Sequence, residues 1–521
     1  MLSFTTTITT SAALALLAGH GADAARFPRA VSGNGYLSIP IGTVDRPRPK
    51  AKRDENPVIS VLENMDFFYA TEIEIGTPGQ TVTVLVDTGS SELWVNPDCD
   101  TVPTDTQQEQ CDAFGSYDPK KSKTPPIGPF GSEEINYGDP TDDATQTSVS
   151  LRYYTETLGF GDYNITNQTF GVVESSEGIS QGIFGLAPDL NGGFDGDEPY
   201  SLVLNTMFEQ GLIASRVFSL DLRHSEAKTG AVIYGGVDKS KFIGKLDSHE
   251  IIRGARGEFR LAVRLNSMGL TIDDESQDYD LGRKDSNVIL DSGTTLTRMH
   301  ASAAAPILRA LDAMDDGEGY YYTDCSLRET GGSVDFGFDS TIIRVPFRDF
   351  IIDVGAPDYC AIGMVITTDQ QILGDTVLRA GYFVFDWDNE AVHIAQAADC
   401  GDEDIEAVSS GRNAVPDVTG NCDESDANFT GGPVPTATSS DSDESFPTSA
   451  YTTTYTITSC PGFDRDCQTG VVTTQTISAS EATSTSDDGN SDDDEDAAAR
   501  APVVGWMIGL FGGGAVMYNM I

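Results

Sequence analysis

Two aspartates in this chain stand directly after apolar, β-forming segments. Asp87 follows VTVLV and precedes Thr-Gly-Ser, and Asp291 follows NVIL and precedes Ser-Gly-Thr. An ionised carboxylate buried at such a place costs several kcal/mol unless it is hydrogen-bonded. Either motif alone also fits a surface turn, in which Asp caps the turn and Gly supplies a positive φ. The recurrence of the pattern in the second half of the chain favours a functional pair over two accidental turns.

The segments around the two aspartates repeat as well. GIFG at 182–185 follows the first motif, and QILG at 371–374 follows the second at a comparable interval. This internal duplication predicts two similar lobes, in which the two turns meet and bring the carboxylates together. Two carboxylates that close cannot both ionise, so the pair holds one proton over a broad acidic range. One aspartate then activates a shared water as a base, and the other protonates the developing oxyanion of a peptide carbonyl.

Three kinds of neighbour are expected to support the pair. The glycine of each motif lets backbone approach the carboxylates without a Cβ clash. The hydroxyl after each glycine can donate to an outer carboxylate oxygen, and the hydroxyl before it can brace one turn against the other. In chain order these residues are Thr88, Gly89, Ser90, Ser292, Gly293 and Thr294.

Four stretches carry a resemblance to a known family, namely VLVDTGSSELWV, QGIFGLA, VILDSGTTLT and ILGDTVLRAGYFVFDWDN. In this order and spacing they resemble the pepsin family of aspartic endopeptidases across residues 60–397. The resemblance implies a mostly β, two-lobed pepsin-like fold with a catalytic cleft between the lobes, Asp87 and Asp291 as catalytic residues, and peptide substrates. It implies no cofactor, and no Cys-x-x-Cys or His cluster in the sequence argues for a metal. The periodicity of apolar residues adds two helices, at 201–210 and 301–313.

The resemblance also implies a β-hairpin flap with a tyrosine near its tip. INYGDPTDD makes Tyr137 the match, with the indole N–H of Trp94 available to its hydroxyl. The acidic tip at 139–143 departs from the short Gly/Ser/Thr tip of the family, so Tyr153 and Tyr154 remain alternatives, and Tyr137 also fits an ordinary strand position. Two residues match pocket-lining positions of the family and fit a plain core equally well: Leu85 and Ile183.

The N-terminus and the cysteines indicate a secreted chain. Residues 1–24 contain SAALALLAG followed by Ala-Asp-Ala, which predicts a signal peptide although the usual basic start is missing. Eight cysteines in such a chain indicate disulfides rather than metal binding. Chain order favours pairing Cys99 with Cys111 and Cys325 with Cys360. Four cysteines are left to pair within the tail: Cys400, Cys422, Cys460 and Cys467. Glycosylation sequons fit the same compartment, at Asn164, Asn167 and Asn428.

The charge of the chain is strongly negative and unevenly spread. Its 32 basic and 81 acidic residues give a net charge of −49, which argues against a nucleic-acid partner. Basic residues nevertheless dominate 25–53, a segment that ends in Lys52 and Arg53. This pattern predicts a removable pro-segment, and a basic linker is the alternative.

The C-terminal part of the chain differs in composition from the rest. Ser, Thr, Asp and Pro dominate 400–490, which predicts an extended stalk. The apolar end at 491–521 fits a GPI-anchor signal that attaches the chain to a plasma membrane or wall, with a membrane-spanning helix as the alternative. These limits leave a protease body, expected to be monomeric, of an N-terminal lobe at 54–215 and a C-terminal lobe at 216–399.

This organisation looks like the yapsin-like subgroup of fungal cell-surface aspartic proteases, which implies cleavage beside Lys or Arg. Acidic residues in loops expected to rim the cleft also favour basic peptides. The competing function is a non-catalytic wall mannoprotein or adhesin built on the protease fold, although such a protein would be expected to have lost one carboxylate. A Ser or Cys hydrolase is disfavoured because the chain has only five histidines and is expected to contain no nucleophile elbow of the G-x-S-x-G type.

Overall fold

The structure is a computed structural model. It describes residues 29–43, 68–124, 126–138, 146–188, 200–225, 227, 229–254, 259–272, 275–282, 286–317, 319–356, 359–426, 451–456 and 472–477. These sequence-based expectations lie outside the described residues: the signal peptide, the Lys52–Arg53 junction, the sequon at Asn428, the tail cysteines Cys460 and Cys467, and the anchor signal at 491–521.

The chain divides into two compact units. The first covers residues 1–435 with 516–521, and the second covers 436–515. Within the second unit the described residues form an antiparallel hairpin of β30 (Tyr451–Thr456) and β31 (Val472–Ile477). Both aspartate motifs lie in the first unit.

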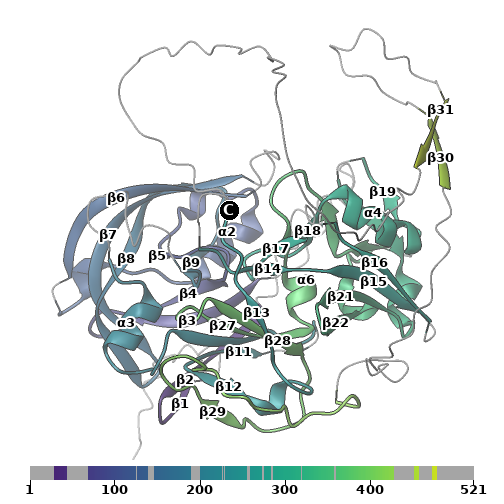
Figure 1. Cartoon of the computed structure of the whole chain (residues 1–521). Coiled ribbons are helices and arrows are strands. Elements are labelled where there is room, and N and C mark those ends of the chain that lie inside the picture. Colours follow the sequence, from purple (N-terminus) through teal and green to yellow (C-terminus); the bar gives the residue numbers. More distant parts are fainter. Residues whose placement is uncertain are drawn as a thin grey trace, which may run out of the picture. The chain divides into compact units, whose positions relative to one another are not determined.

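Strands dominate the first unit, as the alternating apolar patterns predict. Its largest sheet has fourteen strands among the described residues (Figure 1), with β1 (Val31–Gly33) beside β2. The central strands, in spatial order, are β13 (Asp247–Glu250), β28 (Ala391–Gln396), β27 (Gly381–Asp386), β10 (Val217–Asp221), β11 (Gly230–Tyr234) and β2 (Tyr36–Thr43). The sheet continues into the N-terminal lobe through β3 (Tyr69–Ile75), β4 (Gln80–Asp87), β9 (Gly182–Gly185), β5 (Leu93–Val95), β8 (Tyr163–Glu177), β7 (Thr147–Phe160) and β6 (Ile127–Tyr137).

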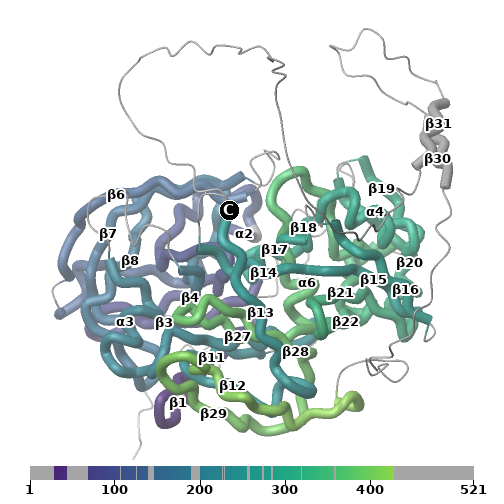
Figure 2. The backbone as a smooth tube through the Cα atoms, viewed as in Figure 1, coloured from purple at the N-terminus to yellow at the C-terminus, as the bar shows by residue number. Residues whose placement is uncertain are grey.

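The C-terminal lobe is built from smaller sheets, drawn in teal and green in Figure 2. The first contains β14 (Ala262–Arg264), β17 (Asn287–Leu290), β26 (Ile372–Leu373), β18 (Thr297–Met299) and β25 (Met364–Ile366). The second contains β16 (Glu275–Asp280), β15 (Ser267–Ile272), β21 (Ser333–Phe338) and β22 (Thr341–Pro346). The third contains β19 (Met314–Asp315), β20 (Tyr321–Asp324), β24 (Tyr359–Ile362) and β23 (Ile351–Ile352).

The same three-strand arrangement occurs once in each lobe. In the N-terminal lobe β9 pairs in parallel with β4 and antiparallel with β5. In the C-terminal lobe β26 pairs in parallel with β17 and antiparallel with β18. The expected two-lobed, mostly β fold with an internal duplication is therefore confirmed, because both aspartate motifs stand at the end of the same strand of this arrangement.

Among the described residues, helices are few and short. The expected helix at 201–210 is α3 (Val203–Glu209), and the one at 301–313 is α4 (Ala301–Ala310). Three more were not expected: α2 (Asp105–Ala113), α5 (Phe347–Phe350) and α6 (Asp375–Leu378). Short 3₁₀ turns are η1 (Cys99–Thr101), η2 (Pro119–Lys121), η3 (Lys239–Lys241) and η4 (Cys325–Glu329). In the part of the chain that the structure describes, no helix is both long and apolar enough to cross a membrane.

Part of the expected pro-segment is folded into the central sheet. Strand β2 pairs with β11 along five residues and with β3 along two. Its Leu37, Ile39 and Ile41 are buried in the main core. Cleavage at Lys52–Arg53 would thus cut the chain between two neighbouring strands of one sheet.

The folded body does not end at residue 399, where the stalk was expected to begin. β29 (Ile405–Ala407) pairs with β12 (Gly236–Asp238), and Val408, Ala414 and Val415 are buried. A disulfide joins Cys400 to Cys422. The boundary is corrected to about residue 426, because apolar residues inside the polar tail cover the central sheet.

Candidate active site

The two aspartates hold equivalent positions in the two lobes. Asp87 is the last residue of β4, opposite Gly185 of β9, and Asp291 directly follows β17. The backbone of each turn is held by the neighbouring strand, since Leu186 N donates to Asp87 O at 2.7 Å and Asp291 N donates to Leu373 O at 3.0 Å. Both side chains are buried, with 4% and 2% exposed. The repeated strand arrangement therefore presents one buried carboxylate from each lobe.

Each carboxylate receives the same hydrogen bonds from its own turn. Gly89 N donates to Asp87 Oδ1 at 2.7 Å, and the Ser90 hydroxyl donates to Asp87 Oδ2. Gly293 N donates to Asp291 Oδ1 at 2.7 Å, and the hydroxyl of the following threonine, Thr294, donates to Asp291 Oδ2 at 2.7 Å. These donors fix the orientation of both carboxyl groups.

The glycines bring the two carboxylates face to face. A Cβ on Gly89 would lie 2.6 Å from Asp291 Oδ1, and a Cβ on Gly293 would lie 2.5 Å from Asp87 Oδ1. Real Cβ atoms do not approach other atoms so closely, so each turn has room for the carboxylate of the other lobe only because it carries glycine. The structure thus brings together all the residues that the sequence grouped around Asp87 and Asp291.

The electrostatics of the pair favour a shared proton. Burial and the neighbouring Asp291 carboxylate raise the pKa of Asp87, although the hydrogen bonds from Ser90 and Gly89 act in the opposite direction. Two buried carboxyls in contact cannot both be charged, so one proton stays on the pair well above the ordinary pKa of aspartate. The pair can therefore offer an acid and a base at once.

Four buried hydrogen bonds tie one turn to the other. The Thr88 hydroxyl donates to Leu290 O at 2.8 Å and accepts from Ser292 N at 2.9 Å. The Ser292 hydroxyl donates to Val86 O at 2.8 Å and accepts from Thr88 N at 3.1 Å. Because each hydroxyl reaches across to the backbone of the other lobe, this network sets the separation of the carboxylates.

A hairpin stands beside the first turn. β6 ends at Tyr137, which pairs with Thr147 at the start of β7, and residues 139–145 between them lie outside the description. Trp94 Nε1 donates to Tyr137 Oη at 2.7 Å. By contrast, the hydroxyl of Tyr153 donates to Glu92 at 2.6 Å, and Tyr154 packs against the main core. Tyr153 lies in the same apolar cluster as Trp94, but among the three candidate tyrosines the described hydrogen bond from the Trp94 indole goes to Tyr137.

The two pocket-lining candidates lie side by side on neighbouring strands. Leu85 of β4 pairs with Ile183 of β9, and both are buried, with 4% and 2% exposed. They belong to an apolar cluster that also contains Trp94 and touches Tyr137. The structure therefore places them in a core beside the flap strand.

Sequence reasoning missed a polar group next to the pair. Asp375, at the start of α6, is 1% exposed, and neither of its carboxylate oxygens has a hydrogen-bond partner among the described residues. Burial raises the pKa of Asp375 well above its usual value, Arg379 opposes the shift, and the charges of Asp291 and Asp87 add to it. Arg379 Nε donates to the hydroxyl of Tyr69 at 2.9 Å, with the guanidinium 5.7 Å from the ring. The signal was present in ILGDTVLR, as two charged residues inside an apolar stretch.

One further motif was also overlooked. GISQG at 178–182 matches the G-x-S-x-G pattern of a nucleophile elbow, which requires a strand-to-helix turn. Here the segment follows β8 and leads into strand β9, and Ser180 is buried with its hydroxyl donating to Gln181. The local structure therefore gives this serine no such role.

The structure also places the cysteines and two sequons. Disulfides join Cys99 to Cys111 and Cys325 to Cys360. Asn164 and Asn167 are exposed on β8, while Cys460 and Cys467 lie outside the described residues. One grouping of possible metal ligands is found in the described residues, at Cys400, Cys422 and Asp426, but its two sulfurs are joined to each other.

Comparison with known proteins agrees with this geometry. The model of the eukaryotic aspartyl protease family matches residues 68–397. Candidapepsin-1 of Candida albicans is 35% identical over 384 residues, covering 70% of this chain and 90% of the relative. The probable aspartic-type endopeptidase opsB of Aspergillus fumigatus is 32% identical over 409 residues, covering 75% and 81%. An aspartic proteinase from Irpex lacteus shares the fold, with a TM-score of 0.51, 18% identity and coverage of 70% and 97%. The chain belongs to the eukaryotic aspartyl protease family and is an aspartic-type endopeptidase.

Proposed function

We propose that Asp87 and Asp291 are the catalytic carboxylates of this endopeptidase. The ionised carboxylate takes a proton from a water held between the two groups, and the resulting hydroxide attacks the carbonyl carbon of the scissile peptide bond. The protonated carboxyl gives its proton to the carbonyl oxygen, which forms a tetrahedral diol. A proton then passes to the amide nitrogen, and the C–N bond breaks. The observation that carries the proposal is the mutual approach of each carboxylate and the glycine of the other turn.

The matching experiment replaces either carboxyl by an amide. Asp87→Asn and Asp291→Asn keep shape and most hydrogen bonds, so each variant should fold while losing nearly all peptide hydrolysis at acidic pH. A statine-type inhibitor should bind the wild type in competition with substrate. Full activity in either variant would contradict the mechanism. It would favour the alternative of a wall mannoprotein or adhesin that uses the fold as a scaffold.

The flap has a supporting role in this proposal. Tyr137 closes over the substrate, and its hydrogen bond to Trp94 holds it at the edge of the apolar cluster that contains Leu85 and Ile183. An apolar substrate side chain can pack there against the partly exposed rim of the cluster, which includes Tyr137 and Val173. Leu85→Ser and Ile183→Ser should raise KM for substrates with a large apolar residue beside the scissile bond.

Activation is proposed to follow cleavage at Lys52 and Arg53. The support is the basic composition of 25–53 and the acidic body, which attract each other until carboxylates protonate. A Lys52→Ala/Arg53→Ala variant should accumulate as a longer and less active form. Normal maturation of that variant, with self-cleavage blocked by an inhibitor, would exclude this junction.

We further propose delivery to the cell surface and a GPI anchor, as in the yapsin-like subgroup. The support is the apolar N-terminus, the sequons, the Ser- and Thr-rich tail and the apolar end of the sequence. A phosphatidylinositol-specific phospholipase should release the enzyme from intact cells. Retention after that treatment, with loss of retention when 491–521 is removed, would favour a membrane-spanning helix instead.

The most detailed part of the proposal is that the enzyme prefers basic peptides as substrates. The loop closed by Cys99 and Cys111 is expected at the rim of the cleft and exposes a row of carboxylates: Asp98, Asp100, Asp105, Glu109 and Asp112. Such a field raises the local concentration of cationic substrates and is screened by salt. Turnover of Lys- and Arg-containing peptides should therefore fall as salt rises. No salt effect, with a preference for apolar residues on both sides of the bond, would refute it.

A further inference from the structure

The central sheet carries apolar side chains on both of its faces. On β27, Phe383 and Phe385 point into the main core, whereas Tyr382 and Val384 belong to a separate cluster. Val217 of β10 lies in the separate cluster as well. Alternate residues of a strand point to opposite faces, so this sheet needs a cover on its second face too.

The cover is residues 399–426, which we call the strap. Its Val408, Ala414 and Val415 are buried in the cluster on the second face. The strap pairs with β12 through β29, and further backbone bonds run from Val408 N to Gly235 O at 2.8 Å and from Gly420 N to Gly244 O at 2.7 Å. It is thus a third layer of the body.

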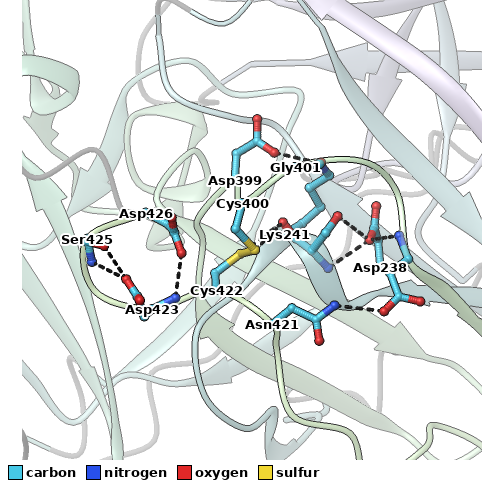
Figure 3. The surroundings of a disulfide bond; sticks show 12 residues. Asp238, Lys241, Asp399, Cys400, Gly401, Asn421, Cys422, Asp423, Ser425 and Asp426 are labelled. Atoms are coloured by element: carbon cyan, nitrogen blue, oxygen red, sulfur yellow. Dashed lines mark hydrogen bonds and ion pairs between the residues drawn. A yellow bond between two sulfur atoms is a disulfide. The ribbon is translucent and has the colours of Figure 1, made fainter.

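Ion pairs hold the strap both where it leaves the body, near Asp399, and on its returning part, near Asp417. Lys241 Nζ contacts Asp399 Oδ1 and Gly401 O, each at 2.7 Å, as Figure 3 shows. Lys241 is 5% exposed, so loss of the Asp399 charge leaves a buried ammonium with carbonyl oxygen as its described acceptor. The contact between the strap and the rest of the body contains ten charged residues, contributed by both sides. They are Asp221, Arg223, Asp238, Lys239, Lys241, Lys245, Asp399, Asp404, Glu406 and Asp417.

These pairs weaken in acid. Burial raises the pKa of Asp399, but Lys241 and Arg223 outweigh it and hold that pKa below its usual value. Hydrogen bonds from Asn421 and Lys239 likewise lower the pKa of Asp404. A carboxylate whose pKa is lower when folded stabilises the fold above its ordinary pKa of about 4, and this contribution is lost as pH falls through the folded pKa. Burial raises the pKa of Asp221 to about 6, although the charge of Arg223 offsets part of this shift. Asp221 therefore acts in the opposite direction.

The disulfide does not depend on pH. Cys400 is tied to the body through its N–H, which donates to Ser240 O at 3.1 Å, and Cys422 lies on the returning leg beside Ile243. Their bond therefore fastens the returning leg to the point where the strap leaves the body. Cutting it enlarges the set of open conformations of the strap, by roughly a hundredfold for a loop of this length.

We propose that the strap is a two-part clasp: its ion pairs keep it closed near neutral pH, and the Cys400–Cys422 disulfide keeps it closed in acid. The enzyme would then retain the cover of its central sheet under the acidic conditions in which the aspartate pair works. The clasp concerns how the strap is held closed, so it can be tested without measuring peptide hydrolysis.

The experiment measures hydrogen-exchange protection of 404–422 in the full chain, at pH 7 and at about pH 2, well below the ordinary pKa of aspartate. All proteins carry Asp87→Asn, so that self-digestion cannot interfere. With the disulfide intact, protection should be high at both pH values. Because the disulfide acts at every pH, protection in Cys400→Ser/Cys422→Ser should be roughly a hundredfold lower than with the disulfide at both pH values. The ion pairs should still leave 404–422 measurably protected at pH 7, and that remaining protection should be lost in acid.

Two controls make the result specific. Cys99→Ser/Cys111→Ser removes a disulfide outside the strap and should leave protection of 404–422 unchanged at both pH values. Adding Lys241→Met to Cys400→Ser/Cys422→Ser removes the buried cation, so the strap should already open at pH 7. Equal protection of the serine variant at both pH values, whether high or low, would overturn the clasp. If the serine variant does not fold, reduction of the folded wild type with a phosphine gives the same comparison.

Discussion

The hydrogen bonds between the two aspartate turns make a sharp test of how the carboxylates are positioned. Thr88→Val keeps the volume of the side chain but removes the hydroxyl that donates to Leu290 O and accepts from Ser292 N. Both backbone groups lie in the buried interior, so each is left without its partner. An unsatisfied buried group costs about 1 to 3 kcal/mol, and two of them predict a loss of about 2 to 6 kcal/mol in the free energy of unfolding. Such a loss is a large part of the stability of an ordinary domain.

The activity should fall as well, because the carboxylates are no longer held at a fixed separation. A displacement of a fraction of an ångström to one ångström in a reacting group predicts a decrease in kcat/KM of about tenfold to a hundredfold. Stability is measured by urea unfolding in the Asp87→Asn background, and kinetics by peptide hydrolysis in the wild-type background. Ser292→Ala should behave similarly. The double variant should cost less than the sum of the two single variants, because both hydroxyls belong to one hydrogen-bond network between the turns.

Thr323→Val is the matched control. Its hydroxyl is buried and donates to Leu311 O at 2.7 Å, outside the hydrogen-bond network that joins the two aspartate turns. It should therefore lose stability through a single orphaned carbonyl while kcat/KM stays unchanged. Equal stability losses for Thr88→Val and Thr323→Val, with unchanged kinetics in both, would show that the bridge between the turns does not position the carboxylates.

Three further outcomes are expected. Burial and the neighbouring Asp291 carboxylate raise the pKa of Asp87, so the folded state favours the protonated pair. The stability that this protonation adds is present in acid and is lost as pH rises through the raised pKa, and activity is lost with it. Urea unfolding across pH should show this decline, and Asp87→Asn should flatten it. Gly89→Ala would place a Cβ 2.6 Å from the carboxylate of the other lobe and should abolish hydrolysis, whereas Gly282→Ala, with open space around it, should leave kinetics unaltered. Trp94→Phe removes the donor to Tyr137 and should lower kcat/KM by about threefold to tenfold, a change that should be absent when it is made in Tyr137→Phe.

The local sequence determined the chemistry of the site. Asp87 takes its hydrogen bonds from residues two and three positions later, and Asp291 does the same, so the short motifs already contain most of each carboxylate's surroundings. The repetition of the motif then predicted the second lobe. Chain order likewise predicted two of the disulfides, because each joins cysteines that are neighbours among the eight.

Only the tertiary structure decided which distant segments meet. Tyr69 and Arg379, 310 residues apart, form a buried hydrogen bond, and no local pattern relates them. A segment that the sequence assigned to a pro-segment became the central strand β2, and the start of the polar tail became a cover for the second face of the sheet. Strand β2 and the strap are buried because the folded sheet brings distant segments of the chain against them. Those partners depend on the path of the whole chain, which the composition of a segment does not contain.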